Sequence, residues 1–325
     1  MKNLAFRAIE FGLTFILALS VNFFLPRAIP GDPIQLLAGD AAPQLGAARV
    51  AALRHEYGLD KPLVEQYLIY LGHLAHGDLG QSFRYSGGKS VVQVLSDSFR
   101  WTLLLVGVSM TLALLIGTAL GMWSAAKHGS SLDLGLLSGV YFLRSIPPFW
   151  LAMLLIPIFA IQLGWLPAGD SYSIPRLAGW ANISDVTRHA LMPLAVLTLA
   201  YLPTAFAVTR ASMFGILESD FIRTAHAKGV PNSGVVFNHA LRNALLPILT
   251  TFMVDLGQLL GGVTVIEVVF NYRGIGEMMF EAVKSRDFPL LQGGFLLFTT
   301  TILLLNLLAE LLYPFLDPRL RKNAT

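Results

Sequence analysis

The sequence predicts an all-α polytopic membrane protein with six transmembrane helices and a small helical extracytoplasmic insertion after the first helix. Composition is the first reason: 54% of the 325 residues are hydrophobic and only 13% are charged, whereas soluble domains carry roughly 25% charged residues. The second reason is that the apolar runs are long and continuous. A membrane β-barrel would show alternation instead, and an open sheet would leave backbone groups unpaired in lipid.

Six apolar runs are long enough to cross a bilayer, whose hydrocarbon core of about 30 Å needs roughly 20 helical residues. They lie at 9–29, 102–125, 132–163, 190–212, 245–270 and 290–315. The first run ends in Pro26-Arg-Ala-Ile-Pro30 and not in a small-residue cleavage site. We therefore interpret it as a transmembrane helix and not as a signal peptide.

The distribution of Lys and Arg in the short loops predicts the orientation, because these residues accumulate on the cytoplasmic side. One side carries Lys2, Arg7, Lys127, Arg210, Arg223, Lys228, Arg242, Arg319, Arg321 and Lys322. The other side carries Arg176, Arg188, Arg273, Lys284 and Arg286. Both termini and the loop 213–244 are thus expected in the cytoplasm. The basic charge balance reflects topology and does not indicate nucleic-acid binding.

The predicted division of the chain follows from these runs. It comprises a first transmembrane helix 1–29, an extracytoplasmic insertion 30–100, a five-helix core 101–316 that contains the cytoplasmic loop 213–244, and a cytoplasmic tail 317–325. The insertion shows helix-like patterns at 44–57 and 62–75. Its apolar residues cover only one face of each helix, so we expect it to lean on the transmembrane helices.

Several spans contain residues that kink helices or allow them to pack closely. They are Pro147-Pro148 and Pro157 in the third span, Pro193 and Pro203 in the fourth, and Pro247 and Gly261-Gly262 in the fifth. Two interpretations stay open: a role in gating, or the ordinary composition of membrane helices.

A polar segment between the fourth and fifth spans, Glu218-Ser-Asp-Phe-Ile-Arg-Thr-Ala-His-Ala-Lys-Gly229, predicts a helical elbow. Apolar residues at four-residue spacing form one face of a short helix: Leu217, Phe221 and Ala225. Gly229 and Pro231 end that helix. A second helix is expected to begin with Asn232-Ser233 as its cap and to enter the membrane at Leu245.

Within this elbow, Arg223-Thr-Ala-His-Ala-Lys-Gly229 and His239-Ala-Leu-Arg-Asn-Ala-Leu-Leu-Pro247 resemble the EAA loop of binding-protein-dependent permeases, in its dipeptide/oligopeptide/nickel form. Arg223 replaces the glutamate of the general motif and Thr224 replaces its first alanine. The resemblance continues in Pro30-Gly-Asp-Pro33, Tyr57-Gly-Leu-Asp-Lys-Pro62, Gly77-Asp-Leu-Gly80, Ser145-Ile-Pro-Pro-Phe-Trp150 and Val268-Val-Phe-Asn-Tyr-Arg-Gly-Ile-Gly276. It therefore covers nearly the whole chain.

The resemblance implies a permease subunit of an ATP-driven ABC importer for dipeptides or short oligopeptides, forming half of a translocation pathway in the bacterial inner membrane. The implied partners are a second related permease, two cytoplasmic ABC ATPases, an extracytoplasmic solute-binding protein and membrane lipid. No catalytic residue, cofactor or metal is expected on this chain, because ATP binds the partner subunits. The implied ATPase-coupling residues are Glu218, Asp220, Phe221, Arg223, Thr224, Ala225, His226, Ala227, Lys228 and Gly229.

Three alternative functions compete with this interpretation. The same architecture carries chelated nickel or other small solutes in related proteins, although a pathway without clustered His, Met or Cys argues against bare metal ions. A self-contained secondary transporter would show an inverted repeat with charged broken helices. An intramembrane hydrolase would need paired catalytic groups. Neither feature is evident in the sequence.

Two charges inside the predicted spans, Arg144 and Asp255, are functional candidates, because a charge in lipid costs at least about 2.5 kcal/mol on insertion scales. Both lie at similar depth along their helices. One hypothesis is a buried ion pair between the third and fifth helices. The other is that they line the pathway and meet the two termini of a zwitterionic peptide.

Overall fold

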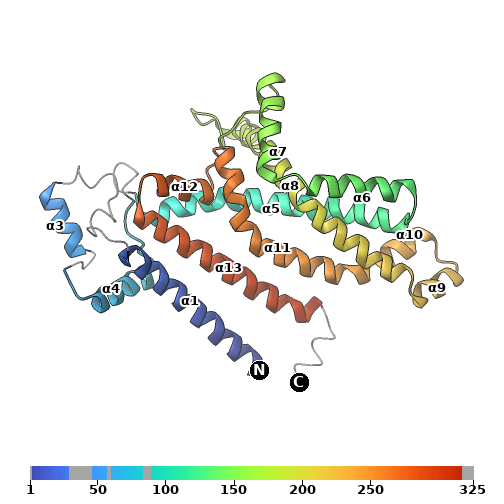
Figure 1. Ribbon diagram of the computed structural model, residues 1–325, viewed down its shortest axis with the longest axis horizontal. Helices are drawn as coiled ribbons and strands as arrows, with labels where there is room; N and C mark the ends of the chain where they lie inside the picture. Colours follow the sequence, from blue (N-terminus) through green and yellow to red (C-terminus); the bar gives the residue numbers. More distant parts are fainter. Residues whose placement is uncertain (1, 29–45, 57–59, 83–88, 317–325) are drawn as a thin grey trace. The chain divides into compact units, whose positions relative to one another are not determined.

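The computed structural model describes residues 2–28, 46–56, 60–82 and 89–316, and these form helices and connecting loops (Figure 1). The only β-type pairing among them is a single bridge between Gln81 and Ser90. The predicted all-α class is therefore confirmed. The chain divides into two compact units: residues up to 102 with 273–304, and residues 103–272 with the segment from 305 onward.

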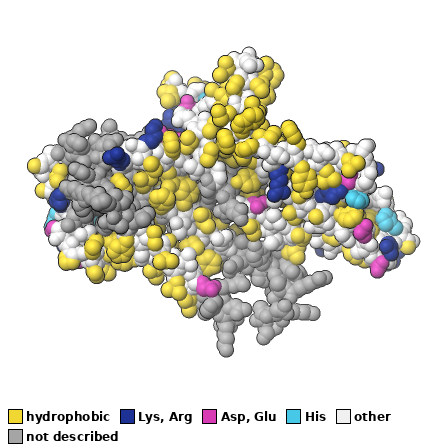
Figure 2. Space-filling model, viewed as in Figure 1, with side chains coloured by type: hydrophobic (Ala, Val, Ile, Leu, Met, Phe, Trp, Pro, Cys, Tyr) yellow, Lys and Arg dark blue, Asp and Glu magenta, His cyan; other side chains and the backbone are white. Residues whose placement is uncertain are grey.

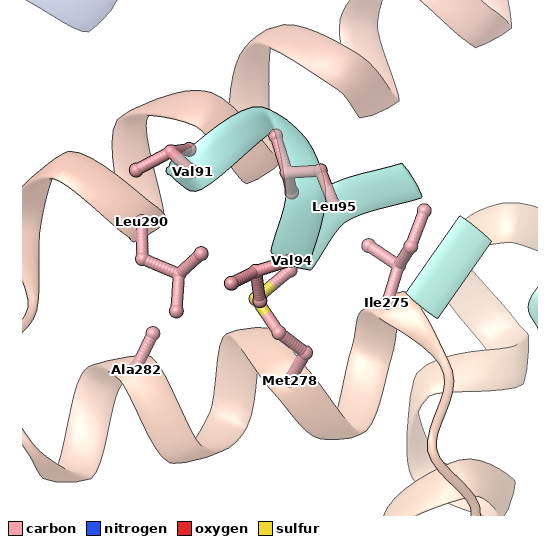
Figure 3. Packing of buried hydrophobic residues seen from close by; sticks show 7 residues of the cluster. All are labelled: Val91, Val94, Leu95, Ile275, Met278, Ala282 and Leu290. Carbon is pink, nitrogen blue, oxygen red and sulfur yellow. The ribbon is translucent and has the colours of Figure 1, made fainter. Parts of the chain in front are cut away.

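The first unit contains α1 (Lys2–Ala28), α3 (Ala47–Glu56), α4 (Leu63–Ala75), the first turns of α5 (Val91–Ala126), α12 (Ile275–Lys284) and much of α13 (Phe288–Leu316). Its core joins three helices (Figure 3), through Val91, Val94 and Leu95 of α5, Ile275, Met278 and Ala282 of α12, and Leu290 of α13. Segments on either side of the second unit in sequence thus share one core.

The predicted insertion contacts the first helix within this unit. The ring of Tyr67 on α4 lies 5.1 Å from that of the fully buried Phe23 on α1, and its hydroxyl is 2.8 Å from Ser20 Oγ. Asn22 Nδ2 donates to the carbonyl of Gln292 at 2.9 Å, and Gln292 Nε2 donates back to the carbonyl of Asn22 at 3.1 Å. The expectation that the insertion leans on a predicted transmembrane helix is confirmed for α4.

The second unit contains the rest of α5, then α6 (Ser131–Arg144), α7 (Pro148–Leu155), the π-helix η2 (Ile156–Gln162) and α8 (Gly179–Leu217). After α8 come α9 (Asp220–Ala227), α10 (Asn232–Gly234), the π-helix η3 (Val235–Leu241) and α11 (Arg242–Val269). The long helix α8 packs against α6, α7 and α11.

Two glycines allow α5 and α8 to lie in direct backbone contact. A Cβ added to Gly117 would lie 2.9 Å from the carbonyl oxygen of Leu202, and one added to Gly121 would lie 2.6 Å from that of Phe206. Small residues four apart are the usual way in which membrane helices approach this closely. The side chain of Phe206 is fully buried beside this contact, in a cluster with Ala113, Val140 and Leu202.

The third predicted span is broken, which corrects the expectation of one continuous helix over 132–163. The segments Ser131–Arg144 and Pro148–Gln162 meet at an angle of 92°. The cause is Pro147-Pro148: a residue before proline is forced out of the α region, and Pro147 adopts extended angles of φ −60° and ψ 137°. Pro148 then serves as the first residue of α7.

Three helices in the described part of the chain are each long and apolar enough to cross a membrane: Val91–Ala126, Gly179–Leu217 and Phe288–Leu308. The broken pair makes a fourth if it counts as one span. Six spans are therefore not confirmed and stay a prediction. Hydrophobic side chains occupy much of the visible surface (Figure 2), and Phe142, Trp150 and Ile161 are each more than half exposed.

Two of these helices begin well before the predicted spans. Helix α5 starts at Val91 instead of 102, and α8 starts at Gly179 instead of 190. Both extensions contain charged residues, such as Asp97 and Asp185, which a search for apolar runs passes over. The predicted boundary of the insertion at residue 100 consequently falls inside α5.

We predict that Gly121→Ala destabilises the protein by about 1–3 kcal/mol, the usual cost of forcing an extra carbon into a filled contact. The added Cβ would collide with the backbone of α8, which cannot move as a flexible side chain does. The measurement is the thermal midpoint in mild detergent. Gly107→Ala on the same helix is the matched control. A Cβ added there would have no atom within 4 Å apart from the backbone of its own helix and its chain neighbours. Equal midpoints for the two variants would contradict the prediction.

Candidate functional site: the elbow between α8 and α11

The elbow, residues 218–242, contains two helical arms. Helix α8 ends at Leu217, Ser219 adopts extended angles of φ −72° and ψ 152°, and α9 follows over Asp220–Ala227. Asp220 in the first turn of α9 suits the partial positive charge of a helix N-terminus. The predicted short helix is therefore present.

Helix α9 ends in a Schellman motif centred on Gly229. The amide of Gly229 donates to the carbonyl of His226 at 2.9 Å, and the amide of Val230 donates to that of Ala225 at 3.2 Å. Gly229 has φ +77°, a conformation that a side chain disfavours. The prediction that Gly229 ends the helix is confirmed.

The buried face of α9 differs from the predicted one. The structure buries Ile222 and Ala225, which are 2% and 7% exposed, whereas Phe221 is 48% exposed. The prediction carried one helical period from Leu217 to Ala225, but the break at Ser219 resets that period. Leu217 belongs to α8, and the inward positions of α9 are three residues apart.

The second arm also begins differently from the prediction. Pro231, not Asn232 or Ser233, occupies the cap position, and no side chain caps the helix. Residues Asn232–Gly234 continue into η3 and then directly into α11. Wide π-helical turns are rare in proteins, and those that occur are often found at functional sites. The elbow therefore joins α11 without an intervening loop.

Two apolar clusters hold the arms together and attach them to the long helices. Ile222 and Ala225 of α9 pack against Val235 of η3. Ala240 of η3 and Ala244 of α11 pack against Met213 of α8, in a cluster that also contains Ala125 of α5 and Ile248 of α11. A force on α9 would thus reach α5, α8 and α11 through packed side chains.

The outer surface of the elbow carries most of the predicted coupling residues. All of them except the buried Ala225 are exposed: Glu218, Asp220, Phe221, Arg223, Thr224, His226, Ala227, Lys228 and Gly229. Arg223 Nη1 lies 3.4 Å from Asp220 Oδ1, with both side chains more than three-quarters exposed. Such a pair contributes about 0–1 kcal/mol, so both charges are free to exchange partners.

Phe237 on η3 is 55% exposed and is a residue that the sequence reasoning missed. The pattern around it offers no warning, because helical periodicity shifts inside a π-helix. Each arm thus exposes one phenylalanine, Phe221 on α9 and Phe237 on η3. Exposed aromatic side chains among polar ones are characteristic of protein interfaces.

A buried ion pair lies close to the elbow, and its two residues are not among the predicted site residues. Arg210 of α8 donates from Nε to Asp133 Oδ1 at 2.9 Å and from Nη2 to Oδ2 at 2.8 Å. Asp133 is 1% exposed and also accepts from Ser124 Oγ and from the amide of Gly129. The pair therefore ties α8 to α6 and to the end of α5.

A sequence signal for Asp133 did exist. Ser130 caps α6 and accepts a hydrogen bond from the Asp133 amide at 3.3 Å, which is the spacing of an N-terminal capping pattern. From the sequence, Arg210 is recognisable only as one of the basic residues that predict the orientation. Its partner became recognisable only when the fold brought two distant segments together.

Arg144 and Asp255 do not form the hypothesised ion pair. Arg144 is exposed at the end of α6, and no ion pair in the described part of the chain joins it to Asp255. Arg144 is the last residue of α6, just before the break at Pro147-Pro148. Asp255 instead lies half-buried in the wall of a pocket. The hypothesis that these charges meet a substrate stays a prediction.

Two family models match the chain. One, described as binding-protein-dependent transport system inner membrane component, matches residues 117–322, which include the elbow. The other, described as the N-terminal part of such a membrane component, matches residues 1–106. Together they extend over nearly the whole chain.

Individual relatives agree with these matches. The chain is 37% identical to the di/tripeptide transport system permease protein DppB of Pseudomonas aeruginosa, over 98% of this chain and 99% of that protein. It is 37% identical to the glutathione transport system permease protein GsiC of Pectobacterium atrosepticum, over 95% of each. The inward-facing MetNI methionine ABC transporter aligns with a TM-score of 0.55 at 16% identity, over 70% of this chain and 97% of that one, and shares the fold.

We predict that Asp133→Asn destabilises the protein by about 3 kcal/mol or more, because it leaves Arg210 beside a neutral partner in a largely buried site. Arg210→Lys should also destabilise it, since lysine cannot reproduce the two parallel hydrogen bonds. The measurement is the thermal midpoint in detergent. Asp220→Asn is the control, because its pair with Arg223 is exposed. Similar shifts for Asp133→Asn and Asp220→Asn would count against a structural role for the buried pair.

Proposed function

Because the chain belongs to the family of inner membrane components of binding-protein-dependent transport systems, we propose that it forms half of the pathway of an ATP-driven peptide importer and couples to a separate ATPase through the elbow. Members of this family are membrane permeases and are not themselves catalytic. The observation that carries the coupling proposal is the build of the elbow. Its inner face is buried against three long helices, and its outer face is exposed and includes Phe221.

Peptides are the proposed cargo. The two relatives described above are named for di- and tripeptides and for glutathione, which is itself a short peptide. Both align over nearly their whole length, which supports the same class of substrate here. ATP is proposed to bind only the partner subunits.

The proposed assembly contains this chain, a second related permease, two ABC ATPases and an extracytoplasmic solute-binding protein. The excess of Lys and Arg beside the elbow supports a cytoplasmic position for it and for both termini. The ATPases would therefore dock on the side where ATP is present. The solute-binding protein would deliver its cargo on the opposite side.

Coupling is proposed to proceed by rigid movement of the elbow. Closure of the ATPases on ATP displaces α9, and the packed contact between Ile222, Ala225 and Val235 carries η3 with it. Ala240 and Ala244 then pass the movement to Met213 of α8. Packed interfaces switch between discrete arrangements more readily than they deform. The helices would therefore rock as a unit and open the pathway outward.

We predict that Phe221→Ala weakens association with the ATPase about 30-fold, equivalent to about 2 kcal/mol, which is typical of an aromatic interface anchor. The measurement is the affinity of the purified permease pair for the ATPase in detergent. Phe280→Ala on α12 is the matched control, because that side chain is similarly exposed, at 45%. Unchanged affinity for Phe221→Ala would remove Phe221 from the proposed interface.

We predict that Gly229→Val abolishes ATP-driven uptake without removing the protein from the membrane. A β-branched residue at φ +77° is strained by about 1–2 kcal/mol and would distort the end of α9. Gly77→Val is the control, because Gly77 has φ +73° and open space around it but lies outside the elbow. Uptake in proteoliposomes is measured for both. The coupling assignment fails if Gly229→Val transports as well as Gly77→Val.

A further inference from the structure

A pocket within the second unit combines one carboxylate with apolar walls. Helices α5, α8 and α11 line a space of about 290 Å³, part of it open to the outside. Its polar side chains are Asp255, Tyr201 and Thr251, and the rest of the lining is apolar, including Phe252 and Met110. Most of this space is open, and its enclosed part has room for about one water molecule or one ammonium group.

Asp255 has no partner among the residues that the structure describes. No hydrogen bond or ion pair reaches its carboxylate there, and the hydroxyl of Thr251, one turn earlier, donates to the carbonyl of Pro247 at 3.0 Å. Asp255 lies 13 residues after the first residue of α11 (255 − 242), which is about 20 Å along the axis at 1.5 Å per residue. That depth places it well inside the predicted fifth span.

A half-buried carboxylate without a partner is costly in such a place, and charges in spans mark substrate or ion paths. The chemistry that would satisfy it is a compact cation with an apolar body. The cationic group would enter the space, where the aromatic rings of Phe252 and Tyr201 would tolerate a positive charge. The body would lie against the apolar residues at its open side. A dipeptide with a free α-ammonium group meets both requirements.

We propose that Asp255 receives the α-ammonium group of a short peptide as the peptide passes the open side of the pocket between α5, α8 and α11. This inference rests on the proposed function, since it takes peptides as the cargo. The pocket adjoins the cluster of Ala125, Met213, Ala240, Ala244 and Ile248 that anchors the elbow, because Ile248 also lies in the pocket wall. Leu114 and Val208 line the pocket and pack against the same cluster. Movement of the elbow would therefore reshape the site that holds the cation.

The rival occupant is a cationic side chain of the second permease. In that case Asp255 would be an assembly contact, and removing its charge would loosen the permease pair. The two possibilities differ in one measurable respect. Only a peptide site distinguishes a free amino group from a blocked one.

The test uses the absence of cysteine from this chain. Thr251→Cys places a thiol one helical turn from Asp255, in the complete importer reconstituted in lipid nanodiscs. The thiol is reacted with a cationic and with an anionic methanethiosulfonate reagent. Each rate is measured from the increase in mass of this chain, and the two rates are compared. Gly107→Cys, at an open position on α5, serves as the control thiol.

We predict that the cationic reagent is favoured at Thr251→Cys and that adding Asp255→Asn lowers the rate ratio by about fivefold or more, since one nearby charge is lost. The ratio at Gly107→Cys should not change. Dialanine should slow labelling of Thr251→Cys, and N-acetyl-dialanine should not. Asp255→Glu, which keeps the charge, should preserve the protection by dialanine, whereas Asp255→Asn should abolish it.

Three results would overturn the proposal: a rate ratio indifferent to Asp255→Asn, equal protection by dialanine and its acetylated form, or loss of the second permease on purification of Asp255→Asn. ATP-dependent uptake of dialanine by the unsubstituted importer is measured separately. Its absence would refute the proposed peptide function, while the charge selectivity would still report on the pocket. The two failures are thereby distinguishable.

Discussion

The bidentate contact between Arg210 and Asp133 is the interaction on which the arrangement around the elbow depends. Removing either partner from a buried pair leaves an uncompensated charge, so the elements that supply the two groups are held in one relative position. Those elements are the last turns of α8 and the start of α6, with Ser124 of α5 and the amide of Gly129 completing the site. His128 extends the network, with Nδ1 3.1 Å from Arg210 Nη2 and its ring 4.3 Å from that of Phe214.

From that fixed base, close packing supplies the remaining rigidity. Gly117 and Gly121 bring the backbone of α5 onto α8, and small residues such as Ala125, Ala240 and Ala244 allow α11 to join them. Interiors packed in this way transmit displacement with little compression. Ile248 lines the Asp255 pocket and also belongs to the cluster that packs Ala240 of the elbow against α5 and α8. One packed body therefore links the exposed surface of the elbow to the pocket that Asp255 lines.

The buried and half-buried charged groups of the second unit differ in whether they have a partner. Asp133 and Arg210 satisfy one another, as expected of charges whose role is structural. Asp255 has no such partner among the described residues, and most of the residues that line its pocket are apolar. An unsatisfied charge costs stability, which supports the proposal that a ligand satisfies Asp255 during function. The charged side chains of α9 are exposed to solvent, so they carry no desolvation penalty in the isolated chain. Such a surface suits reversible binding.

The class of fold, the existence of the elbow and its end at Gly229 can be predicted from the amino-acid sequence, because hydropathy, local charge and backbone freedom act over short stretches of chain. The sequence also carries the family resemblance. The buried face of α9 emerges only in the folded chain, since the break at Ser219 shifts the helical phase. The 92° bend within 132–163 likewise emerges only there. The pairing of Asp133 with Arg210, 77 residues apart, and the isolation of Asp255 from Arg144 also depended on packing between distant segments. Local sequence patterns do not specify which distant residues meet, because those contacts depend on how all the helices pack together.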